Sequence, residues 1–374
     1  MKNNWTCITL AILLPVMNIY RPRYPGKEEK PPPAKNIFII TIDGVRWQEI
    51  FSGADSVLIH SEQYSPGSEI IQSLYWHSSY SERRRLLMPF MWNVIGKKGQ
   101  IFGNRQYGNC VDAANIYALS YPGYNEMLTG AADIDISSNS KIWNENTNIL
   151  GYLARTPGFQ GKVVAFTSWD VFPYILNAER NNLPLNSGYN DVKHQWNNET
   201  MVGLVQQKLV ADKRATRYDQ LTYVAAREYV KQHRPRVLFL GLGETDEFAH
   251  DRRYDSYLQQ INRVDAMIGE MWHWVQTTPG YKDNTTFIIT TDHGRGSKAV
   301  KWHTHGEFIK GSSQAWLAIM GPGIAAEGEN KMKNQYYLEQ LARTIALVAG
   351  ENFREGDAAP AIAVKKNLDS YSQY

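Results

Sequence analysis

The chain has 374 residues, of which 43% are hydrophobic and 21% are charged. This balance is typical of a globular protein and excludes a disordered chain. The net charge is +3, and no long run of Lys and Arg occurs, which argues against a nucleic-acid-binding surface. Two cysteines, Cys7 and Cys110, are too few to form a disulfide framework.

The first predicted element is an N-terminal targeting segment. Lys2 precedes an apolar stretch from Trp5 to Tyr20, which is short for a membrane span and typical of a signal peptide. An uncleaved membrane anchor is the alternative, because no A-x-A cleavage site follows. We assign residues 1–20 to a signal peptide or anchor, residues 21–34 to a Pro-rich linker, and residues 35–374 to a single domain. We therefore expect an exported protein, either periplasmic or extracellular.

Apolar strands and amphipathic helices alternate along the rest of the chain. The predicted strands cover residues 36–44, 162–170, 236–246, 285–294 and 314–323. The predicted helices cover residues 86–99, 220–235, 257–276 and 336–350, and a further helix-like run ends at Thr129-Gly130. This alternation predicts an α/β fold, an α/β/α sandwich around a mostly parallel sheet.

Three of the predicted strands end in side chains that can bind metals. Asp43 ends the first strand, Asp246 the third, and Asp292-His293 the fourth. Ligands of open α/β sheets gather at the carboxyl ends of the strands. The sequence therefore predicts that these side chains meet at one edge of the sheet.

Each candidate also has a structural explanation. Asp43 could simply begin an Asp-Gly turn. Asp246 and His250 are four residues apart, so one helical turn places both on one face, but a solvated helix start explains the pair equally well. As a set, three aspartates and three histidines suit two sites for Zn²⁺ or a similar divalent ion, with His305 as the third histidine and His303 as its competitor.

Ser120 stands at the start of the helix-like run "SYPGYNEMLTG". Backbone N–H groups at a helix N-terminus favour an anion, so a serine there suits a reacting group. The alternative is that Ser120 is an ordinary helix N-cap.

Taken together, five motifs resemble a known family. In order they are "IDG", "SYPGYNEMLTG", "ETDEFAH", "TTDHGRG" and "WHTHG", spanning Asn36 to Gly323. They look like the metal-dependent alkaline phosphatase superfamily, and most closely its nucleotide pyrophosphatase/phosphodiesterase and phosphoglycerate-mutase-like branch. The resemblance implies an alkaline-phosphatase-like fold and a two-metal phosphoester hydrolase, a phosphatase or phosphodiesterase acting on a small-molecule phosphoester.

The resemblance also implies a role for each matching residue. Ser120 would be the nucleophile and would form a phosphoserine. The site would hold two divalent ions, Zn²⁺ in preference to Mn²⁺. The ligands of one ion would be Asp43, Ser120, Asp292 and His293. The ligands of the other would be Asp246, His250 and His305.

Departures from the family pattern keep alternatives open. The arginine of the sulfatase motif is absent after Pro122, and Gly123 stands where the phosphodiesterase branch has an asparagine. Candidate contacts to phosphate are Arg46, Asn125 and Asn139, with Arg295 as a further basic residue. A salt bridge is the favoured alternative for both arginines, and a structural role is the alternative for both asparagines. The alternatives are a sulfatase-like or mutase-like member, a transferase of phosphoethanolamine-like groups between lipids, and a non-catalytic metal-binding relative.

Overall fold

The computed structural model describes residues 35–189 and 215–365. The predicted targeting segment and linker, residues 1–34, lie outside the described residues. Within the described part, no helix has both the length and the apolar character needed to cross a membrane.

The strands have the following bounds: β1 (Asn36–Ile42), β2 (Gln100–Phe102), β3 (Asn109–Asp112), β4 (Val163–Thr167), β5 (Leu185–Ser187), β6 (Val237–Leu242), β7 (Thr285–Thr290), β8 (Gln314–Ala315), β9 (Leu317–Met320), β10 (Gly328–Glu329) and β11 (Asn334–Tyr337). The α-helices are α1 (Trp47–Ser52), α2 (Ser56–Ile59), α3 (Glu69–Tyr75), α4 (Tyr80–Leu87), α5 (Gly96–Lys98), α6 (Ser120–Thr129), α7 (Ile149–Arg155), α8 (Phe172–Ile175), α9 (Ala178–Asn181), α11 (Asp219–His233), α12 (Glu244–His250), α13 (Tyr254–Thr277) and α14 (Leu341–Ala349). A π-helix covers Met91–Ile95, and 3₁₀ turns cover Arg105–Tyr107, Ala299–Lys301 and Leu338–Gln340.

The described residues build one large sheet in the order β10-β2-β9-β7-β1-β6-β4-β5 and a small one in the order β11-β3-β8. In the large sheet, β7, β1, β6, β4 and β5 run parallel to one another, whereas β9 runs antiparallel to both of its neighbours. The predicted mostly parallel sheet is therefore confirmed.

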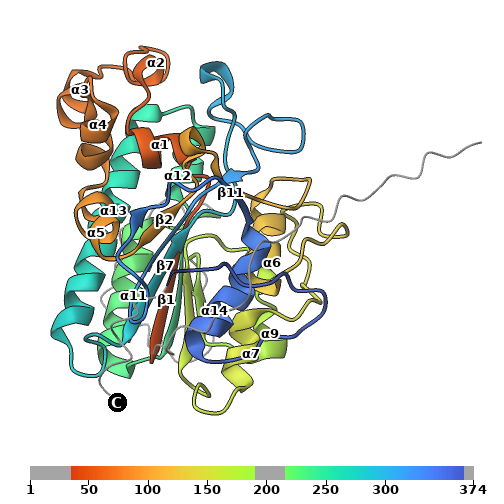
Figure 1. The fold of residues 1–374 in the computed structure, drawn as a ribbon. Helices are drawn as coiled ribbons and strands as arrows, with labels where there is room; N and C mark the ends of the chain where they lie inside the picture. Colours follow the sequence, from red (N-terminus) through yellow and green to blue (C-terminus); the bar gives the residue numbers. More distant parts are fainter. Residues whose placement is uncertain (1–34, 190–214, 366–374) are drawn as a thin grey trace, which may run out of the picture.

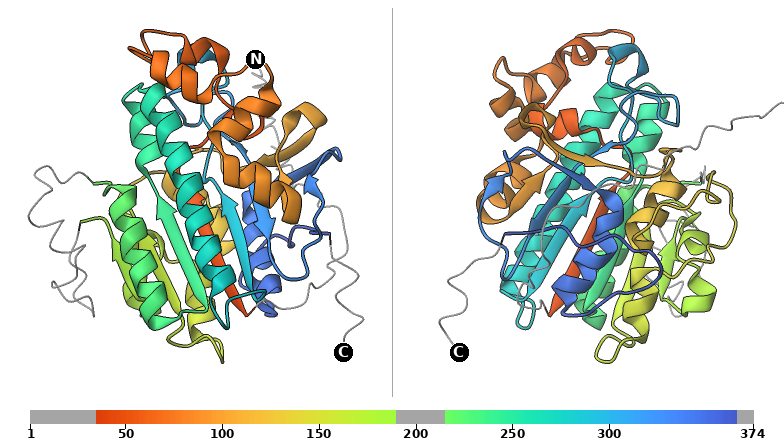
Figure 2. Two further views of the ribbon diagram at one scale, coloured as in Figure 1. Left: turned by 90° about the vertical axis from the view of Figure 1, so that its left-hand side faces the viewer. Right: turned by 45° about the vertical axis from the view of Figure 1, so that its right-hand side comes forward.

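Helices cover both faces of the large sheet, and each layer closes one hydrophobic core. Helices α11 and α13 lie over one face, and α6, α7 and α14 over the other (Figures 1 and 2). The β1 side chains show how one strand serves both cores, because Phe38 and Ile40 enter the first core while Ile37 and Ile39 enter the second. This alternation is the period-two pattern of a strand buried on both faces.

Several predicted elements are interrupted or shortened in the structure. The helix predicted over residues 86–99 breaks after Leu87, because Pro89 disfavours helical geometry at Met88, and the chain resumes as a π-helix and the short α5. The strand predicted over residues 314–323 divides between the two sheets, with β8 in the small sheet and β9 in the large one. The helix predicted over 336–350 begins only at Leu341, because its first residues belong to β11 and a 3₁₀ turn.

Candidate active site

The metal-competent strand ends meet at one edge of the large sheet. Thr41 of β1 pairs with Gly241 of β6 and with Thr290 of β7, so the three strands end at the same level. Asp43 and Asp292 each lie two residues beyond this level. The strand predicted over residues 236–246 ends at Leu242, so Asp246 lies on α12, which begins just beyond β6, and not at a strand end as predicted. The parallel register thus brings together side chains that lie about 200 and 250 positions apart in the sequence, as predicted.

A first group of possible metal ligands consists of Asp43, Asp292 and His293, all of them buried. His293 Nε2 lies 3.5 Å from Asp43 Oδ1 and 3.5 Å from Asp292 Oδ2. Asp292 Oδ2 is buried and has no hydrogen-bond partner among the described residues. A buried carboxylate oxygen without a donor, beside a second carboxylate and an imidazole, fits a divalent cation such as Zn²⁺.

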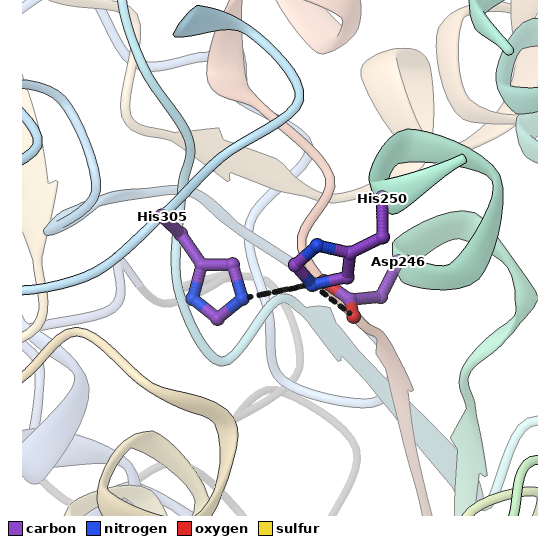
Figure 3. Close-up of side chains that lie close together, drawn as sticks. All are labelled: Asp246, His250 and His305. Carbon is purple, nitrogen blue, oxygen red and sulfur yellow. Dashed lines mark hydrogen bonds and ion pairs between the residues drawn. The ribbon is translucent and has the colours of Figure 1, made fainter. Parts of the chain in front are cut away.

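A second group consists of Asp246, His250 and His305 (Figure 3). Asp246 and His250 stand one turn apart on α12, with His250 Nε2 3.1 Å from Asp246 Oδ2. His305 enters from the opposite loop and places Nε2 3.2 Å from His250 Nε2. The helical spacing noted in the sequence therefore does put both α12 side chains on one face.

The two groups are direct neighbours. The rings of His293 and His305 are stacked with their centroids 3.9 Å apart. Asp246 Oδ1 lies 4.0 Å from His293 Nε2 and 3.8 Å from His305 Nε2. Cations held by the two groups would share one site, as in enzymes that clamp a displacement reaction between paired ions.

Ser120 is the first residue of α6 and faces the first group. Its Oγ lies 3.2 Å from His293 Nε2 and 3.5 Å from Asp43 Oδ1. Leu119 is the N-cap, and its side chain makes no capping hydrogen bond. The alternative that Ser120 is an ordinary N-cap is therefore wrong, and its hydroxyl points into the candidate metal site.

Gly123 allows α6 to approach the end of β7 this closely. A Cβ at this position would lie 2.4 Å from the carbonyl oxygen of Asp292, far inside contact distance. The glycine that departs from the phosphodiesterase pattern is therefore required by packing. One residue further along, Tyr124 donates its hydroxyl to Asp43 Oδ2 at 3.2 Å. The sequence suggested Tyr124 only as an aromatic residue that could line a pocket and did not predict this hydrogen bond, although its position four residues after Ser120 places it on the same helix face.

Two of the three predicted phosphate contacts are buried and bonded to other protein groups. Arg46 is buried and pairs with Glu49 inside the core. Asn125 is buried too. Its Nδ2 donates to Ala131 O, and its Oδ1 accepts from the side-chain amides of Asn144 and Asn146.

Asn139, the third candidate, lies next to the start of α6, where Ser120 stands. Its Oδ1 accepts from the backbone N–H of Tyr121 at 2.9 Å, and the residue is exposed. It is the one predicted phosphate contact that the structure brings next to Ser120.

Arg295 has the salt-bridge role that was the alternative to phosphate contact. It is buried, forms an ion pair with Asp246, and donates to Gly44 O and His303 O at 2.9 Å each. The carbonyl of His303 thus accepts from Arg295. The His303 ring belongs to neither group of possible metal ligands among the described residues, so His305 is the third histidine of the site.

Burial dominates the electrostatics of the site. It raises the pKa of Asp43 to about 8, with the neighbouring Asp292 charge adding to the shift, and raises the pKa of Asp292 to about 7. Burial also lowers the pKa of His293 and, more strongly, that of His305. A divalent cation binds neutral imidazoles and ionised carboxylates, so the lowered histidine pKa values suit it directly, and a bound cation would ionise the two buried carboxyl groups.

The fold and this arrangement define the class of protein, the alkaline phosphatase superfamily. Among solved structures, the chain resembles the alkaline phosphatase PafA (TM-score 0.53, 11% identical, 89% of this chain and 98% of that chain). It also resembles a putative sulfatase from Bacteroides thetaiotaomicron (TM-score 0.55, 14% identical, 90% and 74%). A third neighbour is the lipoteichoic acid synthase LtaP from Listeria monocytogenes (TM-score 0.51, 10% identical, 86% and 74%).

Within this superfamily, the chain belongs to the type I phosphodiesterase / nucleotide pyrophosphatase family, whose model matches residues 108–357. A curated relative is GPI ethanolamine phosphate transferase 1 of Candida glabrata, which is 23% identical over 346 residues. That alignment covers 87% of this chain and 32% of the relative, so the chain spans about a third of the length of that protein.

Proposed function

We propose that this chain cleaves phosphoesters with the help of two divalent cations, and that Ser120 attacks phosphorus. The observation that carries the proposal is the position of Ser120 Oγ, 3.2 Å from His293 Nε2, where the two adjoining ligand groups meet the N-terminus of α6. Family membership adds support, because the family is named for phosphodiester and pyrophosphate cleavage.

Asp43, Asp292 and His293 would hold one cation, and Asp246, His250 and His305 the other. We propose Zn²⁺ rather than Mn²⁺, since imidazole and carboxylate sets of this kind suit it. Bound there, the cations would lower the pKa of the Ser120 hydroxyl and neutralise charge on the phosphoryl oxygens.

The protein's own residues then orient the reaction. Tyr124 fixes the rotamer of Asp43, and Gly123 fixes the distance of α6 from the strand ends. Ser120 gives its proton to solvent water, its oxygen bonds to phosphorus, and the bond from phosphorus to the leaving oxygen breaks with the electron pair departing on that oxygen. We propose that the N-terminal end of α6 stabilises the phosphoryl oxygens together with Asn139, whose Oδ1 accepts from Tyr121 N–H and whose Nδ2 would donate to phosphate. Water then attacks phosphorus and the bond to Ser120 Oγ breaks, which regenerates the hydroxyl and releases phosphate when the substrate is a monoester, or a phosphate monoester when it is a diester.

The test measures p-nitrophenol release from a phosphate monoester, a phosphate diester and a sulfate ester, with metal-loaded wild-type protein beside Ser120→Ala. Ser65→Ala is the matched control, because Ser65 is another buried serine and its hydroxyl donates to Leu58 O, away from the site. We expect turnover of a phosphoester that is lost in Ser120→Ala and kept in Ser65→Ala. Full activity in Ser120→Ala would refute the nucleophile assignment.

Transfer to an alcohol, in place of hydrolysis, is the second candidate. The match to an ethanolamine phosphate transferase over 87% of this chain favours it. A transferase would pass the phosphoryl group of Ser120 to a hydroxyl acceptor. Adding ethanol or glycerol to the assay separates the two functions, because transfer yields an alkyl phosphoester at the expense of free phosphate.

We also propose that the protein is exported, on the strength of the apolar residues 5–20. Edman sequencing of protein recovered from the periplasm or the medium would test this, since cleavage near residue 20 removes the segment and an anchor retains it.

A further inference from the structure

We propose that Glu126 is a positioning residue for His305, acting through the loop that precedes Ser120. The inference rests on the proposed function, because His305 belongs to the second group of metal ligands. It concerns the state of the His305 ring before any metal binds.

Glu126 fixes this loop from inside the protein. The side chain is fully buried in α6, and its carboxylate accepts from the backbone N–H groups of Ala114 (2.9 Å) and Asn115 (2.6 Å). It also accepts from Asn115 Nδ2 at 2.9 Å. Three hydrogen bonds to one buried carboxyl group hold residues 114 and 115 firmly against α6.

Asn115 carries the constraint to Ala118. With its Nδ2 bound by Glu126, the opposite end of the amide, Oδ1, accepts from Ala118 N at 2.8 Å. Ala118 has φ +47°, in the left-handed region that residues with a Cβ seldom adopt. Such a conformation costs on the order of 1–3 kcal/mol and persists only where its surroundings impose it. Asn115 is the neighbour that imposes it here.

The backbone of Ala118 then orients the histidine. His305 Nδ1 lies 2.9 Å from Ala118 O. Because a carbonyl oxygen can only accept, Nδ1 must carry the proton, and Nε2 is left with its lone pair. Nε2 is the atom that faces His250 at 3.2 Å (Figure 3). The carboxylate of Glu126 thus selects the ring tautomer that can bind a cation.

The chain offers a matched control for a purely structural role. Asp265 of α13 is also a buried carboxylate that accepts from two consecutive backbone N–H groups, those of Phe90 (2.7 Å) and Met91 (2.9 Å). Its hydrogen bonds lead to the π-helix and not to the site. Asp265→Asn and Glu126→Gln therefore make the same chemical change at comparable anchors, and only the second is linked to His305.

Two readouts test the proposal on protein shown to be folded by circular dichroism. The first is the histidine tautomer in metal-free protein, from ¹⁵N NMR of histidine-labelled samples, with His305→Asn giving the assignment. The second is Zn²⁺ binding, measured by titration against a metal-buffering chelator.

We expect His305 to be protonated at Nδ1 in the wild type and in Asp265→Asn. In Glu126→Gln we expect a mixture of tautomers and a loss of roughly 10–100-fold in affinity for one of two Zn²⁺ ions. Unchanged tautomer and affinity in Glu126→Gln would overturn the proposal, as would an equal loss in Asp265→Asn. If Glu126→Gln does not fold, Asn115→Ala takes its place, with the same expected and refuting results.

These outcomes are separable from those of the proposed function. A wild type that shows no phosphoester turnover but has a His305 tautomer dependent on Glu126 would sink the proposed function alone. Turnover that depends on Ser120, with a tautomer indifferent to Glu126, would sink the positioning role alone.

Discussion

Substituting Gly123 with alanine should damage activity more than stability. The new Cβ would lie 2.4 Å from Asp292 O, and contacts closer than 3.0 Å essentially do not occur, so α6 and the end of β7 must separate by at least about 0.6 Å. Ser120 sits one turn earlier on the same helix and would move with it. A misplacement approaching 1 Å costs about 10²-fold in rate, so we expect kcat to fall roughly 10- to 100-fold.

Stability should change less, because two effects oppose each other. Overpacking costs on the order of 1–3 kcal/mol, whereas replacing a helical glycine with alanine recovers up to about 1 kcal/mol. The control is Gly96→Ala, the same change at a helical position where the nearest atom to the new Cβ is 3.5 Å away. Steady-state kinetics and urea unfolding of both variants provide the measurement. Wild-type kcat in Gly123→Ala would refute the claim that this contact sets the position of Ser120.

Three further predictions concern metal, pH and the phosphate contact. Removing metal with a chelator should lower Tm by several degrees, because a ligand at 100 times its Kd stabilises a fold by about 2.7 kcal/mol. Differential scanning fluorimetry should show the same Tm shift in Ser120→Ala. A Tm that does not change with chelator would contradict the two proposed ligand groups. Burial raises the pKa of Asp265 from 3.8 to about 7. Protonation of Asp265 therefore stabilises the fold fully below pH 3.8, and this stabilisation is lost as the pH rises through 7. In urea titrations of metal-free protein, the free energy of unfolding should decline less between pH 5 and pH 8 in Asp265→Asn than in the wild type, and an equal decline would contradict this. Asn139→Ala should lower kcat/KM about 10-fold or more by removing a hydrogen bond to a charged oxygen while the metal content, measured by atomic emission, stays at the wild-type level; wild-type kcat/KM would remove Asn139 from the site.

The ligand groups were predictable because they depend on regular structure. Parallel strands end at a common edge, so residues that directly follow β1 and β7 must meet there, whatever their separation in sequence. The pair Asp246 and His250 needed only the period of a helix. For the same reason the central sheet and its covering helices were predictable from apolar periodicity.

The surroundings of the site were not predictable, because they depend on irregular backbone and on side-chain direction. Arg46 follows Asp43 by three residues, yet its guanidinium turns into the core to pair with Glu49. The link from Glu126 to His305 runs through Ala118 in a conformation that no local pattern signals for alanine. The need for Gly123 became visible only once Asp292 O stood against it.

The charges of the site bear on which ester it favours. The two ligand groups contain three carboxylates, and Arg295 pairs with one of them, which leaves two negative charges if the imidazoles are neutral. Two divalent cations would convert this to two positive charges in a largely buried site, where Coulomb interactions are strong. A phosphate monoester dianion balances that charge alone. A phosphate diester and a sulfate ester each carry a single charge and balance it only together with an ionised Ser120. The electrostatic balance therefore favours phosphate monoesters over both, whereas the argument against sulfate esters rests on the missing sulfatase arginine after Pro122.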